Sequence, residues 1–413
     1  MTVAHLTYST AFVERELRRD ARTLSVVTLA IISMLVLSTC HFYSNPQQGA
    51  NLTVTTLNLS EADQIDSEQN HPNLTDWKNA IAVNGYYITG AEQQRSDAKA
   101  GEPPAVLLFG RRSSDKSLQW ATRITTKNFK PASVSETDST DSSSSRSSTY
   151  MRTSSLNTPV KVSPDGNIAA LLLEDQRASL TYFVIISTST GSVLRTAHFT
   201  RPVIRSRLTD THLAVETSER SFPGGSGRGR IEILSTTAPE EPAITYPTDQ
   251  WLTGADHHSF YLTPNPMSGE CESSHCTPMT LTRIDGKGNT VDTITGATET
   301  HFGGWITRYT DPQAAASLLV RYNNATSREQ REAASSEWSN IRIELLNTNS
   351  GTTTDITNLD VTSIRTPTGP RLLVRQSIPS ESNTTKYAPL FWLSAADDGH
   401  PHTEDLEQFQ EDS

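Results

Sequence analysis

The chain has 413 residues, and its 46 aspartate and glutamate residues outnumber its 35 lysine and arginine residues, which gives a formal net charge of -11. This acidic balance argues against nucleic acid and against anionic lipid as partners of the body, because both favour basic surfaces. The mean hydropathy of -0.46 describes a polar body. Only one apolar stretch is long enough to cross a bilayer, which excludes a multi-pass channel or transporter.

Residues 1–22 are predicted to be a cytoplasmic N-terminal tail, and residues 23–43 a transmembrane signal-anchor. The anchor, TLSVVTLAIISMLVLSTCHFY, contains no Asp, Glu, Lys or Arg. As a helix it would reach about 31 Å, which matches the hydrocarbon core of a membrane. Arginines precede it closely, so the positive-inside bias places the N-terminus in the cytoplasm and exports the C-terminal domain. We therefore expect a single-pass protein of the plasma membrane.

The apolar stretch ends in LSTC, which resembles a bacterial lipobox whose cysteine, here Cys40, is lipidated after cleavage. Thr39 stands where a lipobox usually has Gly, Ala or Ser, and the leader is long for a signal peptide. Two anchors therefore remain open: an uncleaved peptide helix, or a lipid on Cys40. Both tether the body to the membrane.

Residues 44–76 are polar and then acidic, and are predicted to form an extracytoplasmic stalk. Within this segment NLTVTTLNLS (51–60) alternates weakly, which indicates a strand able to pair with a sheet edge. At the other end of the chain, residues 407–413 form an acidic tail.

Between residues 77 and 406 one pattern recurs six times: apolar strands that flank a variable loop, then a polar turn and a further strand. The turns align at Lys116, Gly191, Pro239, Gly288, Gly351 and Gly399. Three of the five spacings are about 48 residues. The two longer spacings contain a Ser-rich run (133–155), predicted to be disordered, and a polar, helix-prone segment (327–339). A fixed period of short β runs predicts a β-propeller.

We therefore predict an all-β fold: a propeller of about six (six to seven) four-stranded blades, preceded by one N-terminal transmembrane helix. One four-stranded sheet cannot bury both faces alone, whereas radially packed blades cover each other. A β-sandwich would explain the alternation but not six units of one length. In the fifth unit, the apolar run within 311–324 is predicted to be a strand, and no long amphipathic helix is expected in the body.

Three segments carry a resemblance to known repeats: VLLFGRRSSDKSLQW (106–120), YFVIISTSTGSVLRT (182–196) and ELLNTNSGTTTDI (344–356). They resemble degenerate blades of the β-propeller superfamily, in the style of quinoprotein-like and YVTN/WD40-like repeats. Trp120 stands where quinoprotein-like blades often keep a tryptophan, and VSPDGNIAAL (162–171) is similar to the entry of WD40-like blades. The WD dipeptide and the Asp-box are absent from the sequence. The resemblance implies a fold that hosts enzymes, binders and scaffolds, so it implies no particular activity.

Candidate chemistry is sparse. Cys271 and Cys276 are expected to form a disulfide outside the cytoplasm, and a metal site with His275 is the alternative. His400 and His402, with Asp397 nearby, are the best weak candidates for a metal cluster, since i, i+2 spacing places both on one face of a strand.

Two further motifs are interpreted as loops. The adjacent histidines His257 and His258 are expected in a strand-entry loop rather than in a metal site, and the glycine-rich GGSGRGR (224–230) in a β-turn rather than a phosphate-binding loop. No G-x-S-x-G motif occurs, and no catalytic or cofactor-binding residue is identified.

The predicted function is a non-enzymatic binding or scaffolding module of the cell envelope, which engages an envelope protein or glycan through loops at one face. One alternative is a propeller enzyme, lactonase-like or another metal-dependent hydrolase, with its site at the central channel mouth. A second is a lipoprotein helper in envelope assembly, which depends on Cys40.

Overall fold

The computed structural model describes residues 52–68, 81–93, 105–125, 130–131, 160–175, 180–201, 203–218, 229–264, 276–366, 369–378, 386–394, 399–404 and 406. The chain divides into two compact units, Met1–Asn45 and Pro46–Ser413. The predicted anchor with Cys40, the Ser-rich run 133–155 and the tail 407–413 lie outside the described residues. In the described part of the chain, no helix combines the length and apolar character needed to cross a bilayer.

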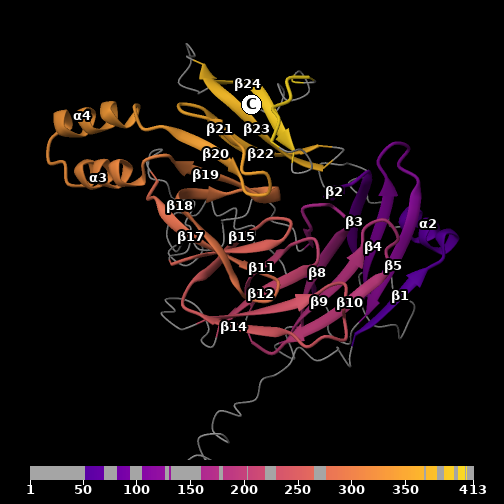
Figure 1. The fold of residues 1–413 in the computed structure, drawn as a ribbon. Helices are drawn as coiled ribbons and strands as arrows, with labels where there is room; N and C mark the ends of the chain where they lie inside the picture. The colour runs from indigo at the N-terminus through magenta and orange to yellow at the C-terminus, as the bar shows by residue number, and fades with distance from the viewer. Residues whose placement is uncertain are drawn as a thin grey trace, which may run out of the picture. The chain divides into compact units, whose positions relative to one another are not determined.

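The strands of the second unit form successive antiparallel sheets in chain order (Figure 1). The first sheet has the order β1-β5-β4-β3-β2. Its strands are β1 (Thr53–Leu57), β2 (Ile81–Val83), β3 (Tyr86–Gln93), β4 (Ala105–Arg112) and β5 (Leu118–Thr125). The second sheet contains β6 (Lys130–Pro131), β7 (Val160–Val162), β8 (Ile168–Asp175), β9 (Leu180–Ser187) and β10 (Val193–Phe199). The third contains β11 (Val203–Leu208), β12 (His212–Ser218), β13 (Gly229–Ser235) and β14 (Ile244–Thr248).

The fourth sheet is longer because it holds two repeat units. Its strands are β15 (Trp251–Ala255), β16 (Ser259–Thr263), β17 (Met279–Asp285), β18 (Thr290–Thr300), β19 (Trp305–Tyr309), β20 (Ile343–Asn347) and β21 (Thr353–Asp355). The strand β18 pairs with β17 along most of its length and with β19 at its end, so it joins the two units. The last sheet consists of β22 (Asp360–Thr366), β23 (Gly369–Ile378) and β24 (Lys386–Ser394). The described part of the chain is mostly β, and its successive antiparallel sheets confirm the predicted repeats, while three helices interrupt the all-β pattern.

Most of the aligned turns contain a residue in the left-handed backbone conformation. Five of the six turn residues have positive φ: Lys116 (58°), Gly191 (67°), Gly288 (79°), Gly351 (75°) and Gly399 (94°). Glycine populates this region without the steric cost that other residues meet, which explains its recurrence in the pattern. The sixth position, Pro239, cannot adopt positive φ. There the connection between β13 and β14 is longer, because it spans residues 236–243.

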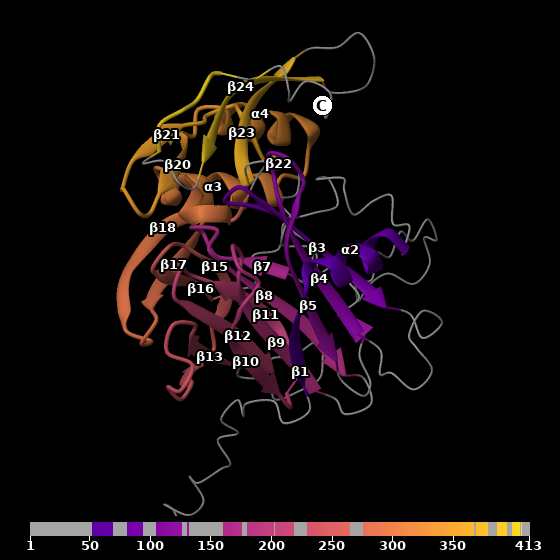
Figure 2. The same cartoon turned by 90° about the vertical axis from the view of Figure 1, so that its right-hand side faces the viewer.

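Two elements that precede β2 in the chain, β1 and the helix α2 (Leu59–Glu68), pack on the first sheet. The predicted edge pairing of residues 51–60 is confirmed, since β1 pairs with β5 in antiparallel register. The helix α2 follows β1 and packs against β5, as Figure 2 shows. Both elements lie in the segment predicted as a stalk, but β1 is the edge strand of the first sheet and α2 packs against that sheet.

The strand prediction for 311–324 is wrong, because this run forms the helix α3 (Pro312–Asn323). Asp311 caps it by accepting a hydrogen bond from the Ala314 amide at 2.9 Å, and Pro312 occupies the first helical position. The helix-prone segment that follows does form a helix, α4 (Arg328–Trp338), with a capping box at Ser327. The pair lies side by side between β19 and β20 and is called the α3–α4 hairpin below (Figures 1 and 2).

The core lies between neighbouring sheets, and Trp120 shows how closely they approach. Its indole is buried between Gly110 of its own sheet and Gly191 in the turn of the next sheet. A Cβ atom on Gly110 would lie 2.0 Å, and one on Gly191 2.4 Å, from indole carbons. The indole Nε1 donates to the Thr188 carbonyl at 2.8 Å. Trp120 therefore docks one repeat unit onto the next, while β2 of the first sheet contacts β22 and β23 of the last.

Candidate functional site

Five short turns come together along one edge of the sheets, and we call this set the turn face. Each turn connects the first two strands of a repeat unit. The turns comprise residues 84–85, 163–167, 209–211, 256–258 and 301–304. A second turn of the same unit lies beside four of them and donates a backbone hydrogen bond to them. These bonds are Ser113 to Gly85 (2.8 Å), Thr188 to Asn167 (3.0 Å), Thr236 to Thr211 (2.9 Å) and Thr348 to Gly304 (3.0 Å).

A repeated side-chain cap shapes three of the turns. Ser163, Thr209 and Asp256 occupy the same position, and all three side chains are fully buried. The Ser163 hydroxyl accepts from the Ile168 amide at 3.0 Å, and the Thr209 hydroxyl accepts from the His212 amide at 3.0 Å. Asp256 accepts from the Ser259 amide at 2.6 Å. Ser, Thr and Asp favour such local turns because their short side chains reach nearby backbone N–H groups.

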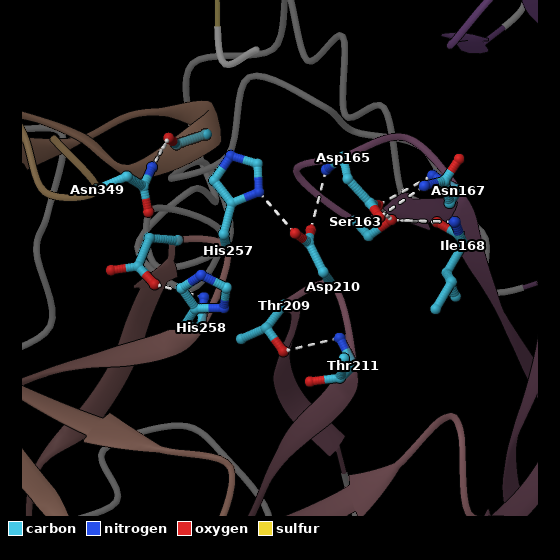
Figure 3. A network of polar contacts seen from close by, with 12 residues as sticks. Ser163, Asp165, Asn167, Ile168, Thr209, Asp210, Thr211, His257, His258 and Asn349 are labelled. Atoms are coloured by element: carbon cyan, nitrogen blue, oxygen red, sulfur yellow. Dashed lines mark hydrogen bonds and ion pairs between the residues drawn. The ribbon is translucent and has the colours of Figure 1, made fainter. Parts of the chain in front are cut away.

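Asp210 joins turns from three repeat units (Figure 3). One carboxylate oxygen accepts from the backbone amide of Asp165 at 3.0 Å, and the other lies 2.6 Å from Nδ1 of His257. The Asp210 amide also donates to the His257 carbonyl at 3.1 Å. A further hydrogen bond, from Asn84 Nδ2 to Asn167 Oδ1 at 2.9 Å, connects the first unit to the same series of hydrogen bonds. The turn face is therefore one continuous polar network across four units.

Asp256, in the turn 256–258, points its carboxylate into the protein and joins the fourth unit to the fifth. Its carboxylate is fully buried and accepts from Arg283 Nη2 at 2.7 Å, the Tyr261 hydroxyl at 2.9 Å and the Thr348 hydroxyl at 3.1 Å. Burial, together with the Asp256 charge, raises the pKa of Tyr261 well above its ordinary value. Burial alone would lower the pKa of Arg283, but the Asp256 carboxylate raises it. A buried charge with this many partners is a structural anchor.

The outer side of the turn face is polar. Four turns of the turn face carry one exposed side chain each, Asn84, Asn167, Thr211 and His258, and Asn349 from the second turn of the fifth unit is exposed beside the turn 301–304. Asn349 is held by a hydrogen bond from its Nδ2 to the Gly303 carbonyl at 3.0 Å. Amide, hydroxyl and imidazole groups at fixed spacing are able to donate and accept hydrogen bonds with a peptide or a sugar.

The predicted site residues are dispersed. His257 and His258 lie in the turn 256–258, as expected, and His257 faces Asp210. His400 is exposed, whereas His402 stacks on Trp392 with ring centroids 4.0 Å apart and lies 2.7 Å from Glu404 Oε1.

Other predicted site residues fall outside the described residues. Asp397 is among them, so the metal hypothesis for His400 and His402 stays a prediction. Within the described ranges, no group of three or more His, Cys, Asp or Glu residues is placed to hold a metal ion. Cys271 and residues 224–228 also lie outside the described residues, so the disulfide of Cys276 and most of the glycine-rich turn stay predictions.

Sequence reasoning missed Asp210 and Asp256. Their signal is the aligned short segments SPDG (163–166), TDTH (209–212) and DHHS (256–259) at the start of three units, each with an aspartate in a turn-forming context. Sequence reasoning also missed three cationic side chains on neighbouring strands: Lys161 on β7 with Arg205 and Arg207 on β11. Burial and the charge of Arg207 lower the pKa of Lys161 to about 8.

No protein-family model and no curated protein matches the chain. Its fold is similar to the β-propeller domain of the trilobed protease from Pyrococcus furiosus, with a TM-score of 0.37 and 8% identity over 77% of this chain and 82% of that one. BamB from Moraxella catarrhalis matches with a TM-score of 0.30 and 8% identity over 76% and 89% of the two chains. An acylaminoacyl peptidase from Pyrococcus horikoshii matches with a TM-score of 0.35 and 9% identity, and the chain covers 45% of it. The repeat architecture rests on the sheets and turns described above.

Proposed function

We propose that this protein is a membrane-tethered, non-enzymatic binding or scaffolding module that engages an extracytoplasmic protein or glycan through the turn face. The observation that carries the proposal is the network centred on Asp210, which holds turns of consecutive units in one fixed arrangement. A surface that is already ordered loses little conformational entropy on binding. Its exposed amide and hydroxyl groups supply directional hydrogen bonds.

Site-directed photo-crosslinking in intact cells tests this role. A photoreactive side chain is placed at the exposed turn positions Asn167 and Thr211 in one pair of chains. In the control pair it is placed at Val320 in α3 and at Ile378 at the end of β23, which are 58% and 43% exposed and do not adjoin the turns of the turn face. We expect discrete crosslinked species from the turn positions and none from the controls. Equal crosslinking at both pairs, or crosslinks from the controls only, contradicts the proposal.

The tether is part of the same proposal and has its own test. Residues 23–43 would hold the chain in the plasma membrane as a peptide helix. Mass spectrometry of the mature N-terminus after membrane extraction should show an intact leader. A mature chain that begins at a lipidated Cys40 would replace the peptide anchor by a lipid anchor, and a soluble mature chain would remove the tether.

A further inference from the structure

We propose that Asn84 is a modification site, where the side-chain amide is lost by spontaneous deamidation, and that Asn167 restrains this reaction. The consequence for binding rests on the function proposed for the turn face, whereas the chemistry does not. Asn84 and Gly85 form the two-residue turn between β2 and β3, and they are the only Asn-Gly pair of the sequence. Asparagine is a thermolabile residue, and a following glycine leaves the attacking backbone nitrogen unhindered by a side chain.

The turn presents both reacting groups at the surface. Both residues have positive φ, 41° at Asn84 and 82° at Gly85, as a tight hairpin turn of this type requires. The Asn84 side chain is exposed. Among the described residues beyond its chain neighbours, the atom nearest to a Cβ placed on Gly85 would be Ser113 Oγ, at 4.0 Å. The space beside the Gly85 backbone is therefore open to the Asn84 side chain.

The reaction consumes only water. The backbone nitrogen of Gly85 attacks Cγ of Asn84, so that a carbon–nitrogen bond forms and Nδ2 leaves as ammonia, which takes up the proton of the Gly85 amide through solvent. Water then adds to one carbonyl of the resulting cyclic imide and opens it, which leaves aspartate or isoaspartate at position 84. No oxidant or reductant takes part, and the loss of ammonia makes the change one-way.

Asn167 holds the reacting side chain away from Gly85. Asn84 Nδ2 donates to Asn167 Oδ1 at 2.9 Å. Asn167 is itself fixed, because its Nδ2 donates to Asp165 Oδ2 at 2.8 Å, as Figure 3 shows. The hydrogen bond from Asn84 must break before Cγ turns toward the Gly85 nitrogen. Its removal should therefore accelerate deamidation by the factor that a neutral hydrogen bond contributes, about fivefold.

Deamidation would disconnect the first unit from the polar network of the turn face. A carboxylate at position 84 has acceptors only, so it cannot donate to Asn167 Oδ1. Rotating the Asn167 amide would offer Nδ2 to position 84, but would place Oδ1 against the Asp165 carboxylate. Neither orientation satisfies both neighbours. The first turn would therefore separate from the second, and the surface offered to a partner would change.

Peptide mapping by mass spectrometry tests the reaction without any partner. The full-length chain is kept at mildly alkaline pH, which favours loss of the Gly85 amide proton, and conversion to aspartate and isoaspartate is followed at three asparagines. Asn289 and Asn324 are the internal comparison, because both are exposed but are followed by threonine and alanine. We expect conversion at Asn84 to be faster than at either of them.

Two alanine variants test the restraint, and one aspartate variant tests its consequence. In Asn167→Ala the acceptor of the Asn84 amide is lost, so conversion at Asn84 should rise about fivefold. Asn349→Ala is the matched control, because Asn349 is also an exposed turn asparagine but lies in the fifth unit. Asn84→Asp should speed hydrogen exchange of the Ser113 amide, which donates to the Gly85 carbonyl at 2.8 Å.

Each outcome decides the proposal. Preferential conversion at Asn84 that rises in Asn167→Ala but not in Asn349→Ala supports it. Conversion at Asn84 no faster than at Asn289 and Asn324 overturns it, and so does an equal rise in both alanine variants. Unchanged exchange of the Ser113 amide in Asn84→Asp overturns the predicted disconnection. If crosslinking at the turn positions fails while Asn84 still converts, the function proposed for the turn face is wrong and the modification site stands.

Discussion

Contacts that join neighbouring repeat units differ in kind from contacts inside the α3–α4 hairpin. Between units, the buried Trp120 and the half-buried Asp210 meet partners 45 to 68 residues away in the sequence. Inside the hairpin, the polar contacts are local and exposed, as in the pair Arg321 and Glu337, whose Nη1 and Oε2 atoms are 2.6 Å apart. Buried, long-range contacts determine whether the sheets stay together, whereas exposed local contacts stabilise one element. The same chemical change should therefore have different consequences in the two regions.

The largest difference is expected between two buried tryptophans. Trp120→Ala would remove the side chain that docks the first unit on the second and leave the Thr188 carbonyl without its donor. We expect a loss of about 4 kcal/mol in the free energy of unfolding, since large-to-small changes of this size in cores cost 3–5 kcal/mol. Trp338→Ala is the control, because Trp338 is also buried but lies in α4, where it packs against Tyr309 at the end of β19. Urea unfolding should show global destabilisation for Trp120→Ala and a smaller, local effect for Trp338→Ala. Equal global losses would contradict the distinction.

Much of this architecture could be predicted from the sequence, and its limits have physical causes. The period and the turns were visible because left-handed turn residues recur as glycine at Gly191, Gly288 and Gly351. The run 311–324 was assigned wrongly because a short apolar stretch fits a strand or a helix, and the deciding signal was the Asp311-Pro312 start. The contact of Asp210 with His257 depends on how successive turns align in space. One sequence does not contain that alignment.

A second test uses pH at a contact between the third and fourth units. Glu216 accepts from the Leu252 amide, and its folded pKa of about 7 lies above the ordinary value of 4.5. The folded state therefore binds the proton more tightly, so the stability contributed by this group is complete below pH 4.5 and is lost as the pH rises through 7. Glu216→Gln should leave stability unchanged at pH 4 and raise it by about 3 kcal/mol at pH 8. The measurement is the free energy of unfolding of both chains between pH 4 and pH 8. A gain in stability of Glu216→Gln that does not change with pH would contradict this linkage.

Asp210 gives the next effect. Asp210→Ala would remove the acceptor for the Asp165 amide and the partner of His257. We expect a loss of about 2 kcal/mol, the usual cost of removing a hydrogen bond to a charged group. Glu337→Ala removes a carboxylate from the exposed hairpin pair and should leave the midpoint of unfolding within experimental error. Asp210→Asn keeps an acceptor for the Asp165 amide and should recover part of the loss. If Glu337→Ala were as damaging as Asp210→Ala, exposure would not explain the difference.

The smallest effect comes from one substitution made in both regions. Ser163 and Ser327 both accept a backbone hydrogen bond at the start of a turn or helix, from Ile168 at 3.0 Å and from Gln330 at 3.2 Å. Loss of a serine cap costs about 1 kcal/mol. In Ser163→Ala the bare amide is buried between sheets, so this loss should appear in global unfolding. In Ser327→Ala water reaches the freed amide and the capping box is exposed, so the loss should appear as faster hydrogen exchange in α4 alone. Faster exchange throughout the sheets in Ser327→Ala would show that the hairpin is coupled to the units it joins.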